Sequence, residues 1–141
     1  MRADLHSHTI YSDGKLTVNE LIDRAINNNV DILAITDHDC FDGSIEAFNT
    51  NKNIKIIFGI ELSTERNDES VHILGYFKQP ITSGPLFDAL IKQRENRYIR
   101  ANKILDLLNE HFRINLNRDF IYERHSITRG TISDQIIKQG Y

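Results

Sequence analysis

Two histidines stand one residue apart near the start of the sequence, and an aspartate follows five residues after the second. His6, His8 and Asp13 all lie in the segment "DLHSHTIYSDG". On an extended strand, side chains two residues apart project from the same face, so the two imidazoles would converge on one point. Imidazole is a common ligand of divalent metals, but two exposed histidines also occur at this spacing by chance. This segment alone leaves a metal site and a surface role equally open.

Three later segments place further candidate ligands in or after apolar runs. His38 follows "DILAITD", Glu61 follows "IIFGI", and His72 lies within "VHILGY". An unpaired carboxylate at position 61 would be costly in an interior, and a metal ion would neutralise it. A lone histidine at position 72 is more often a core residue, and Asp39, next to His38, fits a helix cap in a solvated loop.

Taken together, four predicted strands bring His, Asp or Glu side chains to one edge of a sheet. Nitrogen and oxygen ligands of this kind suit zinc, manganese or iron, and shared carboxylates allow two or three ions to lie within about 4 Å of one another. The clustering therefore predicts a divalent-metal site. His111 and His125 lie outside these segments and are expected to have structural or surface roles, and no chemistry is assigned to Cys40.

The apolar runs predict strands over residues 2–8, 30–39, 53–63 and 70–77. A helix is expected between the first two strands, with Thr17 as its N-cap and Glu20 three residues later. A shorter helix is expected over residues 43–49. This alternation of strands and helices favours a parallel sheet or barrel with helices covering it.

The second half of the chain has a helical pattern. Residues 85–112 carry an apolar stripe at helical spacing, formed by Phe87, Ile91, Tyr98, Ala101, Leu105, Leu108 and Phe112. Residues 117–125 and 131–141 could add two short helices. We therefore expect an α/β unit over residues 1–80 and a helical subdomain over residues 81–141.

Arginines recur every three positions along the predicted long helix, at Arg94, Arg97 and Arg100, and Arg129 stands beside a glycine further on. Guanidinium groups bind phosphate oxygens in pairs, so a subset of these arginines could hold a phosphorylated substrate above the metals. Arg97 and Arg129 are the candidates. The alternative is a solvated helix face, which is the common role of such residues.

The bulk properties exclude several classes of protein. The chain has 141 residues, a net charge of -3 and a single cysteine, which argues against a broad nucleic-acid-binding field, a disulfide framework or a multi-cysteine zinc finger. No apolar run has the length of a signal-peptide core or of a membrane span. We expect one soluble, cytoplasmic domain that does not interact with membranes.

The segments "DLHSHTIYSDG", "AITDHD", "GIELS" and "VHILGY", in this order, resemble the N-terminal half of the PHP-domain metal-dependent phosphoesterases. The helical half more loosely resembles the inserted subdomain of the branch that hydrolyses nucleoside 3',5'-bisphosphates and short oligonucleotides. The resemblance implies an α/β fold, the N-terminal part of a distorted β/α barrel of PHP type followed by an α-helical insert.

The resemblance also implies a set of ligands for up to three divalent ions, of manganese, zinc or iron. His6, His8 and Glu61 would hold one ion, Glu61 would bridge to a second ion held also by His72, and Asp13 and His38 would serve the third. By the same resemblance, Glu61, Asp13 and His38 are the catalytic residues. The family's later barrel strands, which supply further ligands, are absent from these 141 residues, and Thr131 stands where the branch carries a histidine.

The implied function is hydrolysis of phosphate esters of nucleotides or oligonucleotides by metal-activated water, with a phosphorylated small molecule or short oligonucleotide as the substrate. The missing barrel half suggests three possibilities: a piece of a longer enzyme, a half completed by another copy or by a partner chain, or a non-catalytic metal-binding or oligomerisation module. An open sheet edge after the fourth strand would favour such pairing.

Overall fold

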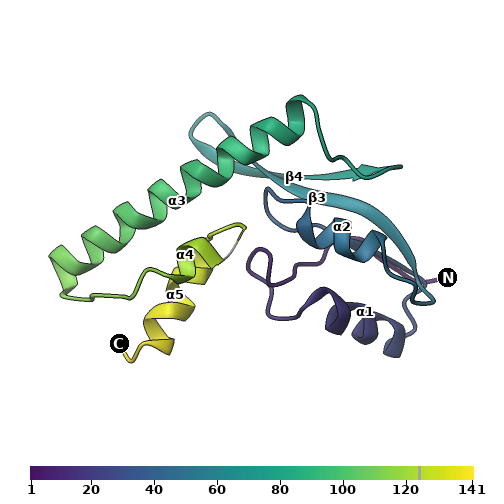
Figure 1. Cartoon of the computed structure of the whole chain (residues 1–141), viewed down its shortest axis with the longest axis horizontal. Helices are drawn as coiled ribbons and strands as arrows, with labels where there is room; N and C mark the ends of the chain where they lie inside the picture. Colours follow the sequence, from purple (N-terminus) through teal and green to yellow (C-terminus); the bar gives the residue numbers. More distant parts are fainter. Residues whose placement is uncertain (124) are drawn as a thin grey trace.

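The computed structural model describes residues 1–123 and 125–141. Arg124, which falls within the segment 117–125 that was expected to be helical, lies outside the described residues. Figure 1 shows a curled sheet with two helices beside it, and a long helix that leads away from the sheet to two shorter ones. The elements are β1 (Ala3–Asp4), α1 (Val18–Asn27), β2 (Ile32–Ile35), α2 (Asp42–Phe48), β3 (Lys55–Arg66), β4 (Glu69–Phe77), α3 (Pro85–Phe112), α4 (Phe120–Glu123) and α5 (Arg129–Lys138).

The sheet has the strand order β1-β2-β3-β4. β2 is parallel to β1 and to β3, as predicted, but β4 is antiparallel to β3, so the expectation of a wholly parallel sheet is wrong for the fourth strand. Only Asn67 and Asp68 separate β3 from β4, and both have positive φ, the conformation of a two-residue hairpin turn. Because a parallel crossover needs about a dozen residues or more, so short a connection produces a hairpin.

The first strand is also shorter than predicted. β1 ends at Asp4, so His6 and His8 follow the strand instead of lying on it. The chain nevertheless continues beside β2, because the Thr36 N–H donates to the Ser7 carbonyl at 2.8 Å. The two histidines therefore remain at the carboxyl end of the parallel strands, without a regular ladder.

The sheet curls so that its two outer strands approach each other. The Tyr76 hydroxyl of β4 donates to the Leu5 carbonyl, just after β1, at 2.8 Å. Such a bond between opposite edges of a four-stranded sheet requires strong curvature, as in part of a barrel. The α/β, partial-barrel architecture predicted from the sequence is thus present.

The two N-terminal helices form as the sequence predicts. The Thr17 side chain accepts the Glu20 N–H at 3.3 Å, and the Glu20 carboxylate accepts the Thr17 N–H at 2.8 Å, which completes a capping box for α1. The fully buried Ile22 then packs with Leu33 and Ile35 of β2. α2 begins at Asp42, one residue before its predicted start.

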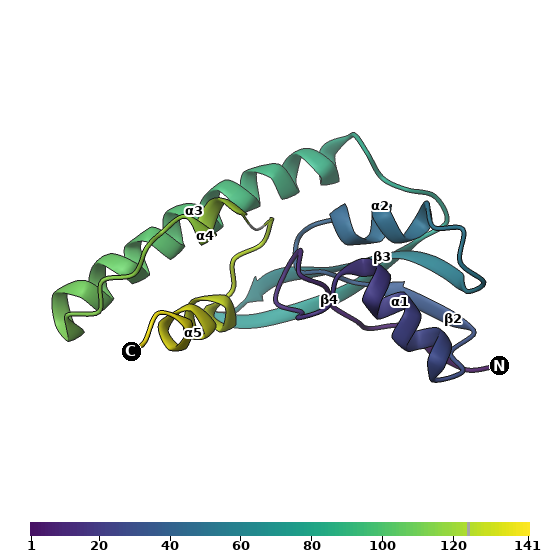
Figure 2. The ribbon, with the colours of Figure 1, turned by 60° about the horizontal axis from the view of Figure 1, so that its bottom comes forward.

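α3 contributes to two hydrophobic clusters. Leu90 packs with Phe41 and Phe58 beside the sheet, while Ala101 and Leu105 pack with residues of α4 and α5. Both views of the ribbon show α3 running from the sheet to these helices (Figures 1 and 2). One helix therefore joins the sheet to the helical part of the molecule.

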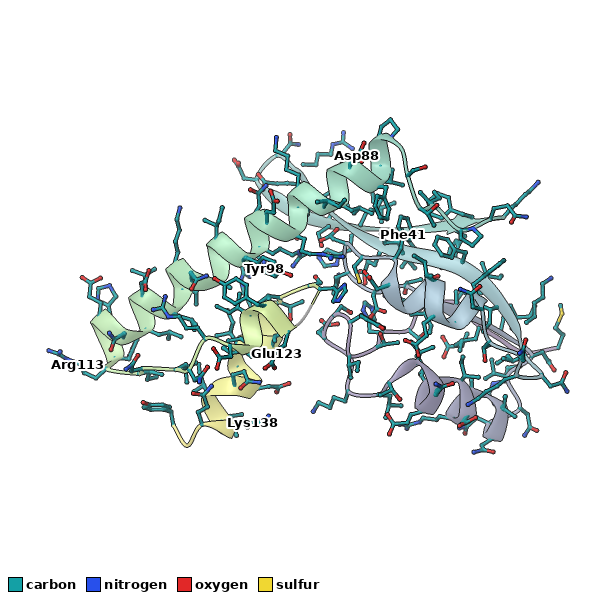
Figure 3. The ribbon with its side chains drawn as sticks, in the orientation of Figure 1. Phe41, Asp88, Tyr98, Arg113, Glu123 and Lys138 are labelled. Carbon is teal, nitrogen blue, oxygen red and sulfur yellow. The ribbon has the colours of Figure 1, made fainter. Side chains whose placement is uncertain are left out.

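The predicted stripe on α3 is only partly correct. Ile91 and Phe112 are exposed, and Arg97 is buried among the apolar positions. Ile91 lies about 100° around the helix from Leu90, which takes the buried position instead. The half-buried Tyr98, labelled in Figure 3, lies on the side of α3 that faces α4. Its ring meets the ring of Tyr122 on α4 edge-on, with centroids 5.6 Å apart.

Candidate metal centre and adjoining cleft

Glu61 on β3 is the centre of the candidate site. Its side chain is buried, and both of its carboxylate oxygens contact imidazoles. Oε2 lies 3.1 Å from His6 Nε2 and 3.0 Å from His8 Nε2. Oε1 lies 2.8 Å from Nδ1 of His72, which the antiparallel β4 places beside β3. One carboxylate thus gathers three histidines from two separate segments of the chain.

Asp13 and His38 complete this group from the other side. Asp13 lies 3.3 Å from His8 Nδ1 through Oδ1 and 3.4 Å from His38 Nε2 through Oδ2. A parallel backbone bridge between His38 and Glu61 holds His38 beside β3, with its Nδ1 3.5 Å from Glu61 Oε2. The structure therefore brings together all six residues that the sequence predicts as metal ligands.

The six side chains form three overlapping groups. In each group the candidate ligand atoms lie within 4.8 Å of one another. The groups are His6 with His8 and Glu61, His8 with Asp13 and His38, and His38 with Glu61 and His72. Because the groups share members, one compact cluster offers several neighbouring positions for cations.

Nearby imidazoles favour the ionised form of the carboxyl groups in this cluster. Burial alone would raise the pKa of Glu61, but hydrogen bonds with His6 and His72 and the nearby rings of His38 and His8 lower it. Hydrogen bonds with His38 and His8 hold the pKa of Asp13 well below its usual range. The cluster is therefore arranged to keep two carboxylates charged inside a ring of imidazoles.

A buried aspartate supports the loop that carries His8 and Asp13. Asp37 is fully buried, and it accepts hydrogen bonds from the Thr9 N–H and hydroxyl, each at 2.7 Å, and from the Ser12 hydroxyl at 2.6 Å. A Cβ at Gly43 would lie 2.3 Å from Asp37 Oδ2, so only glycine fits at that position. Asp37 thus fixes the loop without being one of the candidate ligands.

A cleft of about 310 Å³ opens beside the cluster, between the ligands and the helical part of the molecule. Its lining contains Asp13, His38, Ser63, Ser70, His72, Arg97, Arg100, Thr128, Arg129 and Gly130. A second groove, of about 410 Å³, shares Ser63, Ser70, Arg97 and Arg100 and extends between α3 and the β3–β4 hairpin. Both predicted substrate-binding residues, Arg97 and Arg129, therefore lie on the wall opposite the histidines.

Arg97, Arg100 and Arg129 form one wall of the cleft, the arginine wall. The sequence did not single out Arg100 as a binding residue, and it did not predict the environment of Arg97. Arg100 lines both hollows, and its pKa is lowered by burial and by the nearby charges of Arg97 and Arg129. Arg97 is buried and paired with Asp39, so it is not part of a solvated helix face. Asp39 itself is buried and does not cap α2, which corrects its expected role.

The residues of the cluster fit divalent cations. His38 Nδ1 is buried and has no hydrogen-bond partner among the described residues. Nε2 of His6 and Nε2 of His8 lie 3.1 Å apart and both face the same Glu61 oxygen. A cation would satisfy these converging lone pairs, and imidazole and carboxylate donors suit zinc, manganese or iron.

The histidines outside the cluster contribute little to it. His125 Nδ1 lies 3.0 Å from Asp42 Oδ1, and its ring packs edge-on against Tyr11, so it helps to dock the helical part onto α2. His111 lies in the last turn of α3. Across the described residues, no helix has both the length and the apolar character needed to cross a membrane.

A curled α/β sheet with a cluster of histidines and carboxylates beside it is typical of partial barrels that can hold metal ions. The sequence matches the family model described as the PHP domain over residues 4–116. Because this match covers well over half of the chain, the protein belongs to the PHP-domain family. The fold and the family resemblance predicted from the sequence are both confirmed.

Curated relatives share sequence with about three quarters of the chain. It is 39% identical over 104 residues to a 3',5'-nucleoside bisphosphate phosphatase of Chromobacterium violaceum, a match that covers 72% of this chain and 36% of the relative. It is 37% identical over 111 residues to the 5'-3' exoribonuclease Rnm of Escherichia coli, covering 76% of this chain and 38% of the relative. The chain spans less than two fifths of the length of these relatives.

Two solved structures share the fold. An amidohydrolase from Chromobacterium violaceum, with bound sulfate and no metal, has a TM-score of 0.85 at 33% identity, and the match covers 99% of this chain and 51% of that one. A metal-dependent phosphoesterase from Bifidobacterium adolescentis has a TM-score of 0.71 at 27% identity, covering 77% of this chain and 38% of that one. The likeness to the amidohydrolase includes the helical part as well as the sheet.

Proposed function

We propose that this chain carries the ligand cluster and the arginine wall of a divalent-metal-dependent phosphoesterase that hydrolyses phosphate esters of nucleotides or short oligonucleotides. The observation that carries the proposal is the cleft itself, whose lining Asp13, His38 and His72 of the ligand cluster share with Arg100 and Arg129. The names of the relatives, a bisphosphate phosphatase and an exoribonuclease, support the same class of substrate.

Each side of the cleft has a separate role in this proposal. The ions, up to three in number, are held by His6, His8, Asp13, His38, Glu61 and His72. Divalent ions held there would supply an activated water molecule and offset the charge of the phosphoryl oxygens. Buried Glu61 keeps the imidazoles aligned, and Asp13 orients the rings of His8 and His38.

The arginine wall binds and orients the substrate. Among the described residues, neither Arg100 nor Arg129 has a carboxylate within ion-pair distance, so their charges are available to a phosphate in the cleft. Arg129 is the first residue of α5, and the first turn of that helix lines the cleft, where its N–H groups favour an anion. Guanidinium groups at two points can fix both the position and the orientation of a phosphorylated substrate.

Metal content and phosphate release test the proposal together. Protein purified without chelator should contain divalent metal and release phosphate from adenosine 3',5'-bisphosphate faster than from an aryl phosphate. Dialysis against EDTA should abolish release, and added manganese or zinc should restore it. His8→Ala should lose both metal and activity, while His111→Ala, a histidine on the last turn of α3, should lose neither.

The open sheet edge favours a second possibility, a non-catalytic metal-binding or oligomerisation module. Within the described residues β1 and β4 each pair with one strand only, and Val71 and Ile73 of β4 are exposed. Another copy of the chain, or a partner chain that completes the barrel, could pair with such an edge. Bound metal without phosphate release would support this module, and a monomer in sedimentation at high concentration would count against the pairing.

A further inference from the structure

Asp39 and Arg97 form a buried ion pair beside the cleft. Asp39 is 3% exposed and Arg97 8% exposed. Arg97 Nε donates to Asp39 Oδ2 at 3.0 Å, and Arg97 Nη2 donates to the same oxygen. The pair joins α3 to the turn that follows β2.

The same guanidinium makes two more contacts. Its Nη2 donates to the Ser63 hydroxyl at 2.8 Å, and its Nη1 donates to the Ile127 carbonyl at 3.1 Å. A guanidinium has five N–H groups, so these contacts occupy at least four of them. The usual two-pronged grip on a phosphate is therefore not open to Arg97 in this arrangement.

Asp39 ties the pair to the ligand cluster. It directly follows His38, and its φ of 52° is a left-handed conformation that aspartate tolerates better than most residues. Its N–H donates to the Glu61 carbonyl at 2.9 Å, and its Oδ1 accepts the Ser63 N–H at 2.7 Å. The Asp39 carboxylate is thus fixed relative to two of the candidate metal ligands.

On the other side, Arg97 holds the segment that carries Arg129. Ile127 directly precedes Thr128, the N-cap of α5, and Arg129 is the first residue of that helix. Thr128 and Arg129 both line the cleft. A chain of direct contacts therefore runs from His38 and Glu61, through Asp39 and Arg97, to the start of α5.

We propose that Asp39 and Arg97 are positioning residues, which set Arg129 on one wall of the cleft at a fixed distance from the ligand cluster on the other. Buried ion pairs often add little net stability, and the role best established for them is to specify one arrangement among several. This inference rests on the proposed function, because it concerns how Arg129 meets the substrate. It gives Arg97 an indirect role where the sequence predicts a direct contact.

A double-mutant cycle between Arg97 and Arg129 separates these roles. Arg97→Lys keeps the charge but cannot reproduce the forked contacts. KM for adenosine 3',5'-bisphosphate should therefore rise about tenfold, because even a small displacement of a binding group weakens its contact with the substrate. The value of kcat should change little. If Arg97 acts through Arg129, the double variant Arg97→Lys/Arg129→Ala should be no worse than Arg129→Ala alone. Additive losses would make Arg97 a direct substrate contact and would overturn the inference.

Arg94→Lys is the matched control on the same helix. Arg94 pairs with Asp42 at 3.0 Å, on a partly exposed part of the surface that does not line this cleft. Its substitution should leave KM unchanged. A rise in KM equal to that of Arg97→Lys would show only that α3 is sensitive to any loss of an arginine.

Hydrogen exchange provides a measurement that does not depend on turnover. Amides of residues 126–132 should exchange several-fold faster in Arg97→Lys and in Asp39→Asn than in the wild type, while α1 should be unaffected. Asparagine also tolerates positive φ, so Asp39→Asn removes the charge without forcing the turn to change. If the wild type neither binds nor hydrolyses the bisphosphate, the proposed function fails. Unchanged exchange over residues 126–132 in both variants would overturn the positioning role.

Discussion

The cleft has a wall of imidazoles and carboxylates and an opposite wall of arginines, and different kinds of contact hold the two walls. The ligand wall is built from β3, β4 and the segments that follow β1 and β2, and His38 and Glu61 meet through their own backbones. The arginine wall comes from α3 and from the start of α5. It is fixed to the rest of the molecule mainly by side chains, such as the buried Asp39–Arg97 pair, with one backbone hydrogen bond from the Ser126 N–H to the Tyr11 carbonyl.

This difference separates two ways of making a site. The backbone of a sheet determines which ligands meet, and a substitution there removes a ligand without moving its neighbours far. A wall attached by side chains can shift when one contact is lost, even if its own binding residues are intact. We therefore expect substitutions in the ligand wall to abolish function, and substitutions around the arginine wall to weaken it by degrees.

The largest effect should come from Glu61→Gln. Glutamine keeps the size of the side chain but removes the charge shared by His6, His8 and His72. Phosphate release should fall on the order of 10³-fold, the scale seen when one electrostatic contact is removed at a reaction centre, because the ions would no longer be held firmly. Metal analysis of the purified variant should show that ions are lost as well.

Glu69→Gln is the control, because Glu69 is exposed at the start of β4 and lies outside the cluster. It should retain both metal and activity. Full metal content in Glu61→Gln would contradict the central position that we assign to Glu61, and the comparison of the two walls would lose its basis.

Core substitutions measure how much each region contributes to stability. Phe58 is fully buried and stacks on Phe41 beside the sheet, so Phe58→Ala should lower the free energy of unfolding by about 3–5 kcal/mol. Leu105→Ala, in the helical cluster, should lower it by about 2–5 kcal/mol. Urea unfolding followed by circular dichroism measures both changes.

Metal content then shows whether the regions depend on each other. Under native conditions Leu105→Ala should keep its metal, since its cluster packs around α4 and α5, whereas Phe58→Ala should lose part of it. Equal loss of metal in both variants would mean that the sheet cannot hold the metal ligands in place unless the helical part is intact.

The sequence predicts the ligand wall better than the arginine wall for physical reasons. His6, His8, Glu61 and His72 could be grouped because apolar runs mark neighbouring strands, although His6 and His8 follow β1 and do not lie on it. The hairpin that places His72 was missed, although Asn67 and Asp68 are typical turn residues, because the alternating pattern suggested a parallel strand. An antiparallel strand brings the same histidine to the same place.

Asp39 and Arg97 could not be paired from the sequence. They lie 58 residues apart, and each has a common local role, as a helix cap and as a solvated helical arginine. Burial decides their role, and it depends on where α3 crosses the sheet. The separation into residues 1–80 and 81–141 stays a prediction, and Leu90 shows that α3 also contributes to the sheet-side core.

A moderate effect is expected from Asp37→Asn, which tests how the ligand wall is supported. The amide would place a donor where Asp37 accepts three hydrogen bonds from Thr9 and Ser12, so at least one buried donor would lose its partner. The free energy of unfolding should fall by about 1–3 kcal/mol. Metal affinity should also weaken, because the loop carrying Asp13 would loosen, and titration with manganese would measure it. Unchanged affinity would mean that the ligands hold this loop without Asp37.

The smallest effects should come from two matched helix caps, one in each region. Thr17 caps α1, and Thr128 caps α5, each through a capping box. Thr17→Ala and Thr128→Ala should each lower the free energy of unfolding by about 1 kcal/mol. Thr128 also lines the cleft beside Arg129, so only its substitution should raise KM for the bisphosphate. A rise in KM for Thr17→Ala would show that stability alone changes binding, whereas a rise confined to Thr128→Ala would show that the start of α5 belongs to the binding wall.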